Sequence, residues 1–382
     1  MSIVEVAKVA GLSHSTVSRV INNRPGVAPG TVEAVYRAME SVGYTPPARR
    51  RGRRPRDRRG VETGNIGLVM VSTDAMFARA PVTAAVFHAA ERTLAEQGFN
   101  LIVGQLGDAG RLPPKVARGE VDGLLLHGYA PPADVRDRLA KHPSVWLLSQ
   151  RSVQGYWGDR VTPDNELIGR LAAEHLVRQG HRRLAYLHVS GTHMGYRARA
   201  EAFLEAAGEL GADVELVTKG SVHDRPGMRE EITDAGVDEL VERYAALDPR
   251  PTGLFVPRDR LTVWAYRSLR ARGLSPGRDL EVTSCDNEPI VEALDPRPTT
   301  IDVRPEVIGR RAVEQLLWRI GHADEPTRTT VTVQPKLIVF DESDTTSGQR
   351  RGHEPDARWP AVRDAGWAPS SASAAGPEGD EL

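Results

Sequence analysis

The stretch from Val6 to Asn23 (VAKVAGLSHSTVSRVINN) constrains the fold more than any other part of this chain. Its apolar residues recur at helical spacing on both sides of Gly11, which predicts two short amphipathic helices. The first helix is expected to begin at about Ile3 and to end at Gly11, while Ser13 is placed to cap the second. Two short helices joined by a tight glycine turn are typical of a helix-turn-helix, whose second helix enters the major groove of DNA.

The distribution of charge supports a contact with nucleic acid at this end of the chain. Residues 1–60 hold 12 basic and 4 acidic residues, a net charge of +8, whereas the whole chain has a net charge of −1. A small basic unit attached to a larger acidic body predicts a nucleic-acid contact confined to the basic end. No apolar run approaches the roughly 20 residues needed to span a bilayer. A single cysteine, Cys285, fits a reducing interior, so we expect a cytoplasmic protein.

The rest of the chain alternates between strand and helix patterns. Short apolar runs alternate with longer amphipathic segments from residue 66 to residue 287, which predicts parallel α/β sheets with right-handed connections in two lobes. Residues 341–382 are rich in Ser, Ala, Gly, Pro and charge and show no apolar period, so they are expected to form a disordered tail.

The run AKVAGLSHSTVSRVINN resembles the DNA-binding headpiece of the lac-repressor (LacI/GalR) family of transcription regulators. Further similar segments follow in the body of the chain: IGLV, VDGLLL, TPDNELIGRLAAEHL, GHRRLAYL, RARAEAF and RPTTIDV. The resemblance covers roughly residues 3–340. It implies a small all-α helix-turn-helix headpiece and an α/β two-lobed core similar to a type I periplasmic binding protein.

The resemblance and the composition together divide the chain into four segments. They are a headpiece (1–45), an Arg-rich hinge or linker (46–64), a two-lobed effector-binding and dimerisation core (65–340) and the tail (341–382). Within the core, one lobe is expected to take about 65–162 and 300–331. The other lobe is expected to take 163–299 and 332–340.

The second helix of the headpiece holds the candidate DNA-binding residues. The resemblance places one group toward base edges and another toward phosphates: His14, Ser15 and Arg19 in the first group, and Ser13, Thr16, Ser18 and Asn22 in the second. The chemistry agrees, since Arg matches the O6 and N7 acceptors of guanine and hydroxyls suit phosphate oxygens. The alternative interpretation of His14 is that its side chain is solvated or contacts a phosphate.

The linker departs from the family pattern. Relatives usually have a hinge helix whose leucine enters the minor groove, and Arg53 occupies that position here. Residues 46–60 hold eight Arg and one Asp, with Gly52 and Pro55 among them. One interpretation is a flexible basic linker that contacts phosphates, and another is an arm in the minor groove, because GRRP resembles the core of AT-hook peptides. A folded hinge helix is the third, disfavoured by repulsion between like charges and by both helix breakers.

The candidate effector site lies between the lobes, where ligands of two-lobed proteins bind. The resemblance carries over Arg199 and Asp286, which could donate to and accept from sugar hydroxyls. Phe77, Gln150 and Arg258 are also expected there. Gln150 and Arg258 differ from the usual family residues, and Phe77 ends the triplet Ala75-Met76-Phe77 where the family usually has Asn-Pro-Phe. Arg258 beside Arg199 would favour a carboxylate or phosphate group. Structural ion pairs are the alternative for all three charged residues.

These observations predict a sequence-specific DNA-binding transcription regulator, a repressor controlled by a small-molecule effector such as a sugar or related metabolite. One headpiece buries too little surface for tight binding, so a homodimer on a palindromic operator is expected. No P-loop, GxSxG motif or metal-like His spacing occurs, so we expect neither an enzyme nor a cofactor or metal. The alternatives are a small-molecule binding protein without a regulatory role and a weakly specific architectural DNA binder that uses the Arg-rich arm.

Overall fold

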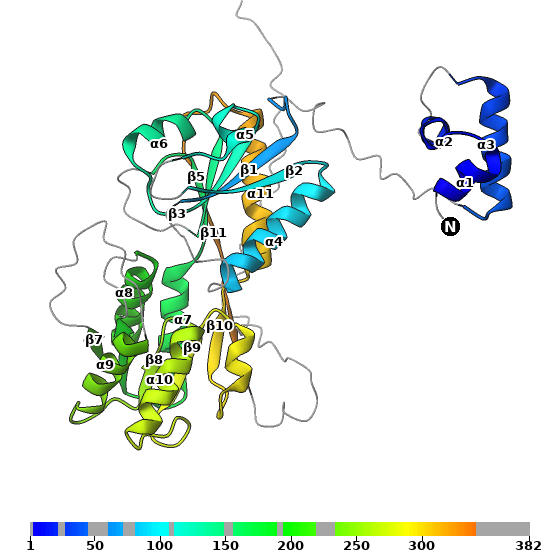
Figure 1. The fold of residues 1–382 in the computed structure, drawn as a ribbon. Helices are drawn as coiled ribbons and strands as arrows, with labels where there is room; N and C mark the ends of the chain where they lie inside the picture. Colours follow the sequence, from blue (N-terminus) through cyan, green and yellow to red (C-terminus); the bar gives the residue numbers. More distant parts are fainter. Residues whose placement is uncertain are drawn as a thin grey trace, which may run out of the picture. The chain divides into compact units, whose positions relative to one another are not determined.

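The structure is a computed structural model, and it divides the chain into two compact units, Met1–Asp57 and Arg58–Leu382 (Figure 1). It describes residues 3–21, 27–44, 60–71, 81–106, 111–148, 156–188, 194–218 and 234–340. The tail and most of the linker therefore lie outside the described residues.

The first unit is a bundle of three helices, and the first two are those predicted from the sequence. They are α1 (Ile3–Ala10), α2 (His14–Ile21) and α3 (Pro29–Ser41). Gly11 and Gly43 follow α1 and α3 with φ of +63° and +61°, a conformation that glycine adopts without steric cost. One face of each helix contributes to a small apolar core: Val6, Ala7, Val17, Val20, Val35, Ala38 and Met39.

In the second unit, lobe 1 is a six-stranded parallel sheet with helices on both faces. The sheet has the order β11-β5-β4-β3-β1-β2. Its strands are β1 (Asn65–Val71), β2 (Asn100–Leu106), β3 (Gly123–Gly128), β4 (Ser144–Leu147), β5 (Asp159–Pro163) and β11 (Thr330–Val333). Its helices are α4 (Pro81–Glu96), α5 (Pro114–Ala117), α6 (Ala133–Leu139) and α11 (Pro305–Gly321).

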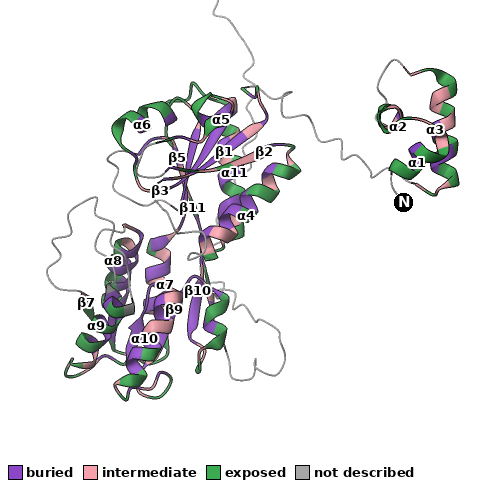
Figure 2. Ribbon diagram, viewed as in Figure 1, coloured by how far each residue is buried: buried purple, intermediate pink, exposed green. Residues whose placement is uncertain are grey.

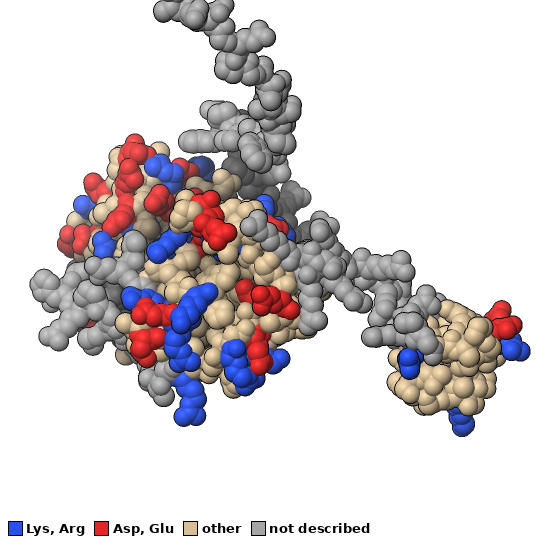
Figure 3. Space-filling model, turned by 90° about the horizontal axis from the view of Figure 1, so that it is seen from above, with Lys and Arg blue, Asp and Glu red and all other residues tan. Residues whose placement is uncertain are grey.

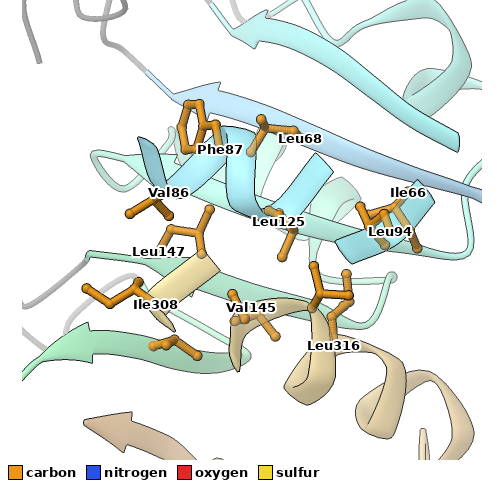
Figure 4. Close-up of a cluster of buried hydrophobic side chains, with 14 of the residues drawn as sticks. Ile66, Leu68, Val86, Phe87, Leu94, Leu125, Val145, Leu147, Ile308 and Leu316 are labelled. Atoms are coloured by element: carbon orange, nitrogen blue, oxygen red, sulfur yellow. The ribbon is translucent and has the colours of Figure 1, made fainter. Parts of the chain in front are cut away.

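Two apolar clusters cover the two faces of the lobe 1 sheet. On one face, side chains from α4 and α11 pack against the strands, with Val86, Phe87, Ile308 and Leu316 among them (Figure 4). The other face packs against α5 and α6. Burial on both faces explains why the central strands β1, β3 and β4 have continuous apolar runs rather than alternating patterns.

Lobe 2 repeats this architecture with a sheet of order β12-β10-β9-β8-β6-β7. Its strands are β6 (Arg183–His188), β7 (Asp213–Thr218), β8 (Gly253–Phe255), β9 (Glu281–Cys285), β10 (Thr299–Asp302) and β12 (Lys336–Ile338). Its helices are α7 (Asn165–Arg178), α8 (Met194–Glu209), α9 (Asp234–Ala245) and α10 (Asp259–Ala271), with a 3-10 turn at η3 (Pro289–Ala293). The cluster under α7 and α8 is distinct from the one under α9 and α10. Figure 2 shows buried central strands and exposed outer helix faces in both lobes.

The chain passes between the lobes three times, and two passages differ from the predicted boundaries. Lobe 1 was expected to resume at about residue 300, but β10 pairs with β9 through Thr299↔Thr283 and belongs to lobe 2. Lobe 1 therefore resumes at α11, and it continues through Val333 because β11 pairs with β5. The end of the core holds two short strands, β11 in lobe 1 and β12 antiparallel to β10 in lobe 2.

A buried ion pair holds the segment between α11 and β11. Asp159 is fully buried and accepts hydrogen bonds from Nε (2.9 Å) and Nη2 (2.6 Å) of Arg319. Gln315 and the amide of Thr329 also donate to this carboxylate. Arg319 in turn donates to two carbonyl groups of the segment. The charges are thus paired and hydrogen-bonded, as buried charges need to be.

The entry of the chain into lobe 1 is fixed by one carboxylate. Asp122 accepts from three successive amides, those of Glu62 (3.0 Å), Thr63 (2.8 Å) and Gly64 (2.7 Å). Gly60 has a φ of +78°, and a Cβ there would overlap the carbonyl oxygen of Ile320. The C-terminal end of the linker is therefore attached to the core at a defined place.

No helix in the described part of the chain combines the length and apolarity that a bilayer crossing requires.

Candidate DNA interface and effector site

The N-terminus of α2 is built around Ser13. Its Oγ accepts a hydrogen bond from the amide of Thr16 at 3.1 Å, which is the N-cap bond predicted from the sequence. The Oγ also lies 2.8 Å from the hydroxyls of both Ser15 and Thr16. Three hydroxyls therefore cluster at a helix N-terminus, where backbone amides and the helix dipole favour an anion.

One face of α2 is buried and the other is exposed. Val17 and Val20 face the headpiece core. His14, Ser15 and Arg19 are exposed together on the opposite side. The predicted phosphate-contacting residues Thr16 and Ser18 are half-buried, and Ser13 is exposed. Asn22 and Arg53 lie outside the described residues. The contacts of all these residues with DNA remain a prediction.

The described part of the headpiece carries no net charge. It has three basic and three acidic residues: Lys8, Arg19, Arg37, Glu5, Glu33 and Glu40. Few charged side chains stand out on the face of this unit drawn in Figure 3. The net charge of +8 over residues 1–60 therefore comes from Arg24 and from the linker segment 46–60, which holds eight Arg and one Asp.

In lobe 2, the carboxyl ends of β8 and β9 gather three predicted effector residues, Arg199, Arg258 and Asp286. Arg199 lies on α8 and is buried. Its Nε donates to Oδ1 of Asn165 at 2.8 Å, and its Nη1 donates to the carbonyl of Pro257 at 2.5 Å. Both of these hydrogen bonds go to neutral acceptors rather than to a carboxylate.

Arg258 is the N-cap residue of α10 and approaches Asp286. Its Nε lies 3.5 Å from Oδ2 of Asp286, and the two side chains are 25% and 9% exposed. Asp286 and Asn287 have φ of 116° and 53°. Positive φ at two successive residues that are not glycine costs conformational energy, and such strain concentrates at functional sites.

Two further carboxyl groups lie beside this pair. Asp259 is fully buried and accepts from the amide of Glu288 (2.7 Å) and from Oγ1 of Thr300 (2.8 Å). Burial, with the nearby charge of Asp286, raises the pKa of Asp259 to about 8. Glu288 is 4% exposed, and burial and Asp286 raise its pKa to about 7 against the opposing effect of Arg258. Its Oε1 has no hydrogen-bond partner among the described residues.

We call these six residues the arginine-carboxylate cluster: Asn165, Arg199, Arg258, Asp259, Asp286 and Glu288. It offers guanidinium donors and carboxyl acceptors at one edge of a sheet, a combination that suits a hydroxylated or anionic ligand. The other predicted effector residues, Phe77 and Gln150, lie outside the described residues. The described residues contain no group of His, Cys, Asp and Glu that could hold a metal ion.

The sequence interpretation missed three members of the cluster. Glu288 lies two residues after Asp286 on the same strand end, and Asp259 lies next to Arg258. Their proximity in the sequence to predicted residues was a usable signal. Asn165 follows β5, a strand that the apolar pattern did not reveal, so nothing placed it beside Arg199.

Two family models match the chain. One is described as bacterial regulatory proteins, lacI family, and matches residues 2–47. The other is described as a periplasmic binding protein-like domain and matches residues 173–339. The matched ranges correspond to the headpiece and to most of lobe 2 with the return through lobe 1.

Curated relatives match over nearly the whole chain. The HTH-type transcriptional regulator CelR of Thermobifida fusca is 32% identical over 348 residues, which are 87% of this chain and 96% of that protein. The HTH-type transcriptional repressor PurR of Mannheimia succiniciproducens is 29% identical over 351 residues, 88% of this chain and 97% of that protein. Both relatives therefore match this chain along almost their whole length.

Solved structures show the same fold. A structure titled as a transcriptional regulator CelR-cellobiose complex has a TM-score of 0.58 and 25% identity, and covers 89% of this chain and 98% of that one. The lac repressor dimer bound to operator and the anti-inducer ONPF has a TM-score of 0.60 with the same coverage. At 21% identity, the second comparison supports the fold alone.

Proposed function

Because the chain belongs to the lacI family of bacterial regulatory proteins, which are effector-controlled DNA-binding regulators of transcription, we propose that it is a homodimeric repressor of a palindromic operator. The observation that carries this proposal is α2, whose buried side fixes it on the headpiece and whose other side presents His14, Ser15 and Arg19. The protein would act in the cytoplasm, where bacterial DNA is found.

Each exposed residue of α2 has a role suited to its chemistry. Arg19 binds O6 and N7 of a guanine with two parallel hydrogen bonds, and His14 and Ser15 contact neighbouring base edges. Ser13 and Thr16, with Ser18 and Asn22, bind phosphate oxygens and set the position of the helix in the groove. Two headpieces are required because a single small module buries too little surface for tight specific binding.

The linker supplies most of the electrostatic attraction to DNA in this proposal. The described headpiece is uncharged overall, whereas the segment 46–60 carries eight Arg and one Asp. Arg53 and its neighbours enter a narrow A·T-rich minor groove at the centre of the operator, where the negative potential is strongest. Binding becomes weaker as salt rises, and the slope of log K against log[salt] reports the number of phosphates bound. Neutralising linker arginines should therefore make this slope shallower by about 0.9 for each phosphate that the linker no longer binds.

A sugar or related metabolite binds at the arginine-carboxylate cluster and controls DNA binding. Support comes from the ion pair of Arg258 with Asp286 at the carboxyl ends of lobe 2 strands and from the similar CelR structure, which holds cellobiose. The effector acts by preferring one arrangement of the core over another, because only such a preference can shift a conformational equilibrium.

The test is a comparison of operator with random DNA. Binding sites selected from random duplexes by the full chain should converge on a two-fold symmetric sequence. Arg19→Ala should reduce the preference for that sequence by about 1–3 kcal/mol, or roughly 5- to 150-fold. Arg37→Ala is the matched control, because it removes the same charge from the exposed face of α3 and should leave the preference intact.

Two outcomes would contradict the proposal. A chain that stayed monomeric and bound operator and random duplexes equally would not be a sequence-specific repressor. Deletion of residues 49–59 separates the proposal from a purely architectural role. A repressor should keep a measurable half-site preference after the deletion, whereas an architectural protein that depends on the arm should lose all binding.

A further inference from the structure

We propose that the effector is an anion, a hydroxylated molecule with a carboxylate or phosphate group that binds Arg258 in the arginine-carboxylate cluster. The inference rests on the proposed function, since it assigns a chemical class to the ligand of the same site. It distinguishes an acidic effector from a neutral sugar.

The first reason is that the two guanidinium groups differ in their contacts. Arg199 is buried, and neutral acceptors on Asn165 and Pro257 occupy its Nε and Nη1. Arg258 keeps a quarter of its side chain exposed and lies 3.5 Å from Asp286. An arginine side chain has five N–H donors in a planar fork that matches a carboxylate or phosphate. Arg258 is therefore the cluster's accessible partner for an anion.

The second reason is the balance of charge. Both guanidiniums stay protonated, and Asp286 is the carboxylate that both of them approach. Asp259 does not offset the second charge, because burial and the nearby Asp286 raise its pKa to about 8 in spite of the hydrogen bonds that its two oxygens accept. At neutral pH the two guanidinium charges thus face Asp286 and a half-ionised Glu288, so the cluster carries more positive than negative charge. A bound anion supplies the missing charge, whereas a neutral sugar does not.

The third reason is Glu288, whose buried Oε1 has no partner among the described residues. With a pKa raised by burial to about 7, Glu288 is half protonated near neutral pH. Its protonated form can donate a hydrogen bond to an oxygen of a bound anion, while its ionised form repels the anion. Binding of an anion therefore includes uptake of a proton at higher pH.

Other charged groups face the same place and leave this direction unchanged. Arg260 lowers the pKa of Glu288, and Asp302 raises that of Asp286. Asp302 accepts from the amide of Arg304 and from Asn287, so hydrogen bonds hold it beside the cluster. These two groups have opposite charges, so together they change the net charge of the site little.

The experiment measures binding to the full chain with matched pairs of probes. Glucuronate is compared with glucose, gluconate with sorbitol, and glucose 6-phosphate with glucose, each at equal ionic strength, by thermal shift and calorimetry. Inorganic phosphate alone is a further probe. We expect at least one acidic member to raise the Tm while its neutral partner does not. Its affinity should fall about tenfold between pH 6 and pH 8, as Glu288 ionises.

Three variants separate the contributions. Arg258→Asn should lower the affinity for the acidic probe about tenfold or more, the expected effect of losing a hydrogen bond to a charged group. Arg267→Asn removes the same charge from an exposed position of α10 and should have no effect. Glu288→Gln should bind the acid with little pH dependence, and it tests the idea independently of whether Arg258→Asn folds.

The inference is wrong if neutral probes bind as tightly as acidic ones, if no acidic probe binds, or if Arg258→Asn keeps the preference for the acid. Its failure is distinguishable from failure of the proposed function. Operator recognition through α2 is measured without any effector, so intact operator preference together with neutral-sugar binding would overturn this inference alone.

Discussion

Replacing Gly169 by alanine should destabilise lobe 2 and disturb the effector site at once. Gly169 lies in α7 where this helix packs tightly against α8. A Cβ at this position would overlap the carbonyl oxygen of Arg199 and lie 2.9 Å from the amide nitrogen of Phe203. Both are backbone atoms, so no side chain can rotate away. Helix α8 has to move back by about 1 Å to restore ordinary contact distances.

The expected magnitude combines two opposing effects. Overpacking of a well-packed interior costs about 1–3 kcal/mol, and the rigid backbone contact places this site at the upper end. The better helix propensity of alanine offsets about 1 kcal/mol of this overpacking cost. The net loss of about 2 kcal/mol corresponds to a decrease in Tm of roughly 4–8 °C. Because α8 carries Arg199, the displacement also weakens its bonds to Asn165 and Pro257 and should reduce effector affinity.

Thermal unfolding followed by circular dichroism measures the effect, with Gly208→Ala as the matched control. Gly208 lies near the end of α8, and a Cβ there would meet no atom within 4 Å. The control should therefore be more stable than the unmodified chain by about 0.4–1 kcal/mol. If Gly169→Ala unfolded at the same temperature as the control, the close approach of the two helices would not exist and the reasoning would fail.

Three further substitutions test other features of the core. Asp122→Ala should lower the free energy of unfolding by about 2–3 kcal/mol, because the amides of residues 62–64 lose a shared charged acceptor. Hydrogen exchange of these amides should become faster, and unchanged exchange would contradict this expectation. Asp159→Leu should cost about 3–5 kcal/mol in denaturant unfolding because it leaves a buried guanidinium unpaired, and adding Arg319→Met should recover most of that loss. His175 is buried with its pKa lowered to about 4 by burial, so the unfolded chain binds its proton first as the pH falls below 6.5. Stability should decrease by about 3 kcal/mol between pH 7 and pH 4 on this account, and His175→Leu should flatten that part of the pH profile.

The sequence by itself determined the headpiece, because its signals are local. Gly11 ends the first helix where the sequence pattern predicted, and the Oγ of Ser13 makes the predicted N-cap bond to Thr16. Pro29 stands at the start of α3. Each of these features acts within four residues along the chain, so no distant part of the fold is needed to specify it.

The alternation of apolar strands and amphipathic helices likewise determined the α/β class. The strands β1, β3, β4, β6 and β8 lie where continuous apolar runs occur, whereas no such run marks β5. Its sequence, DRVTP, has a charged start and a proline end, so only pairing with β4 and β11 makes it a strand. A strand of this composition acquires its burial from neighbours that are distant in the sequence.

Only the tertiary structure decided to which lobe the last strands belong and which residues form the arginine-carboxylate cluster. Sheet membership of β10, β11 and β12 depends on pairing with β9, β5 and β10 respectively, and these partners lie from 16 to 170 residues away along the chain. The approach of Arg258 to Asp286 joins the ends of two adjacent strands, and Glu288 becomes a buried, unpartnered acid only when α10 and β10 pack beside it. The sequence states the type and ordinary charge of each residue, but distances and burial arise from non-local packing. Distance and burial set the protonation state and the accessibility of each group.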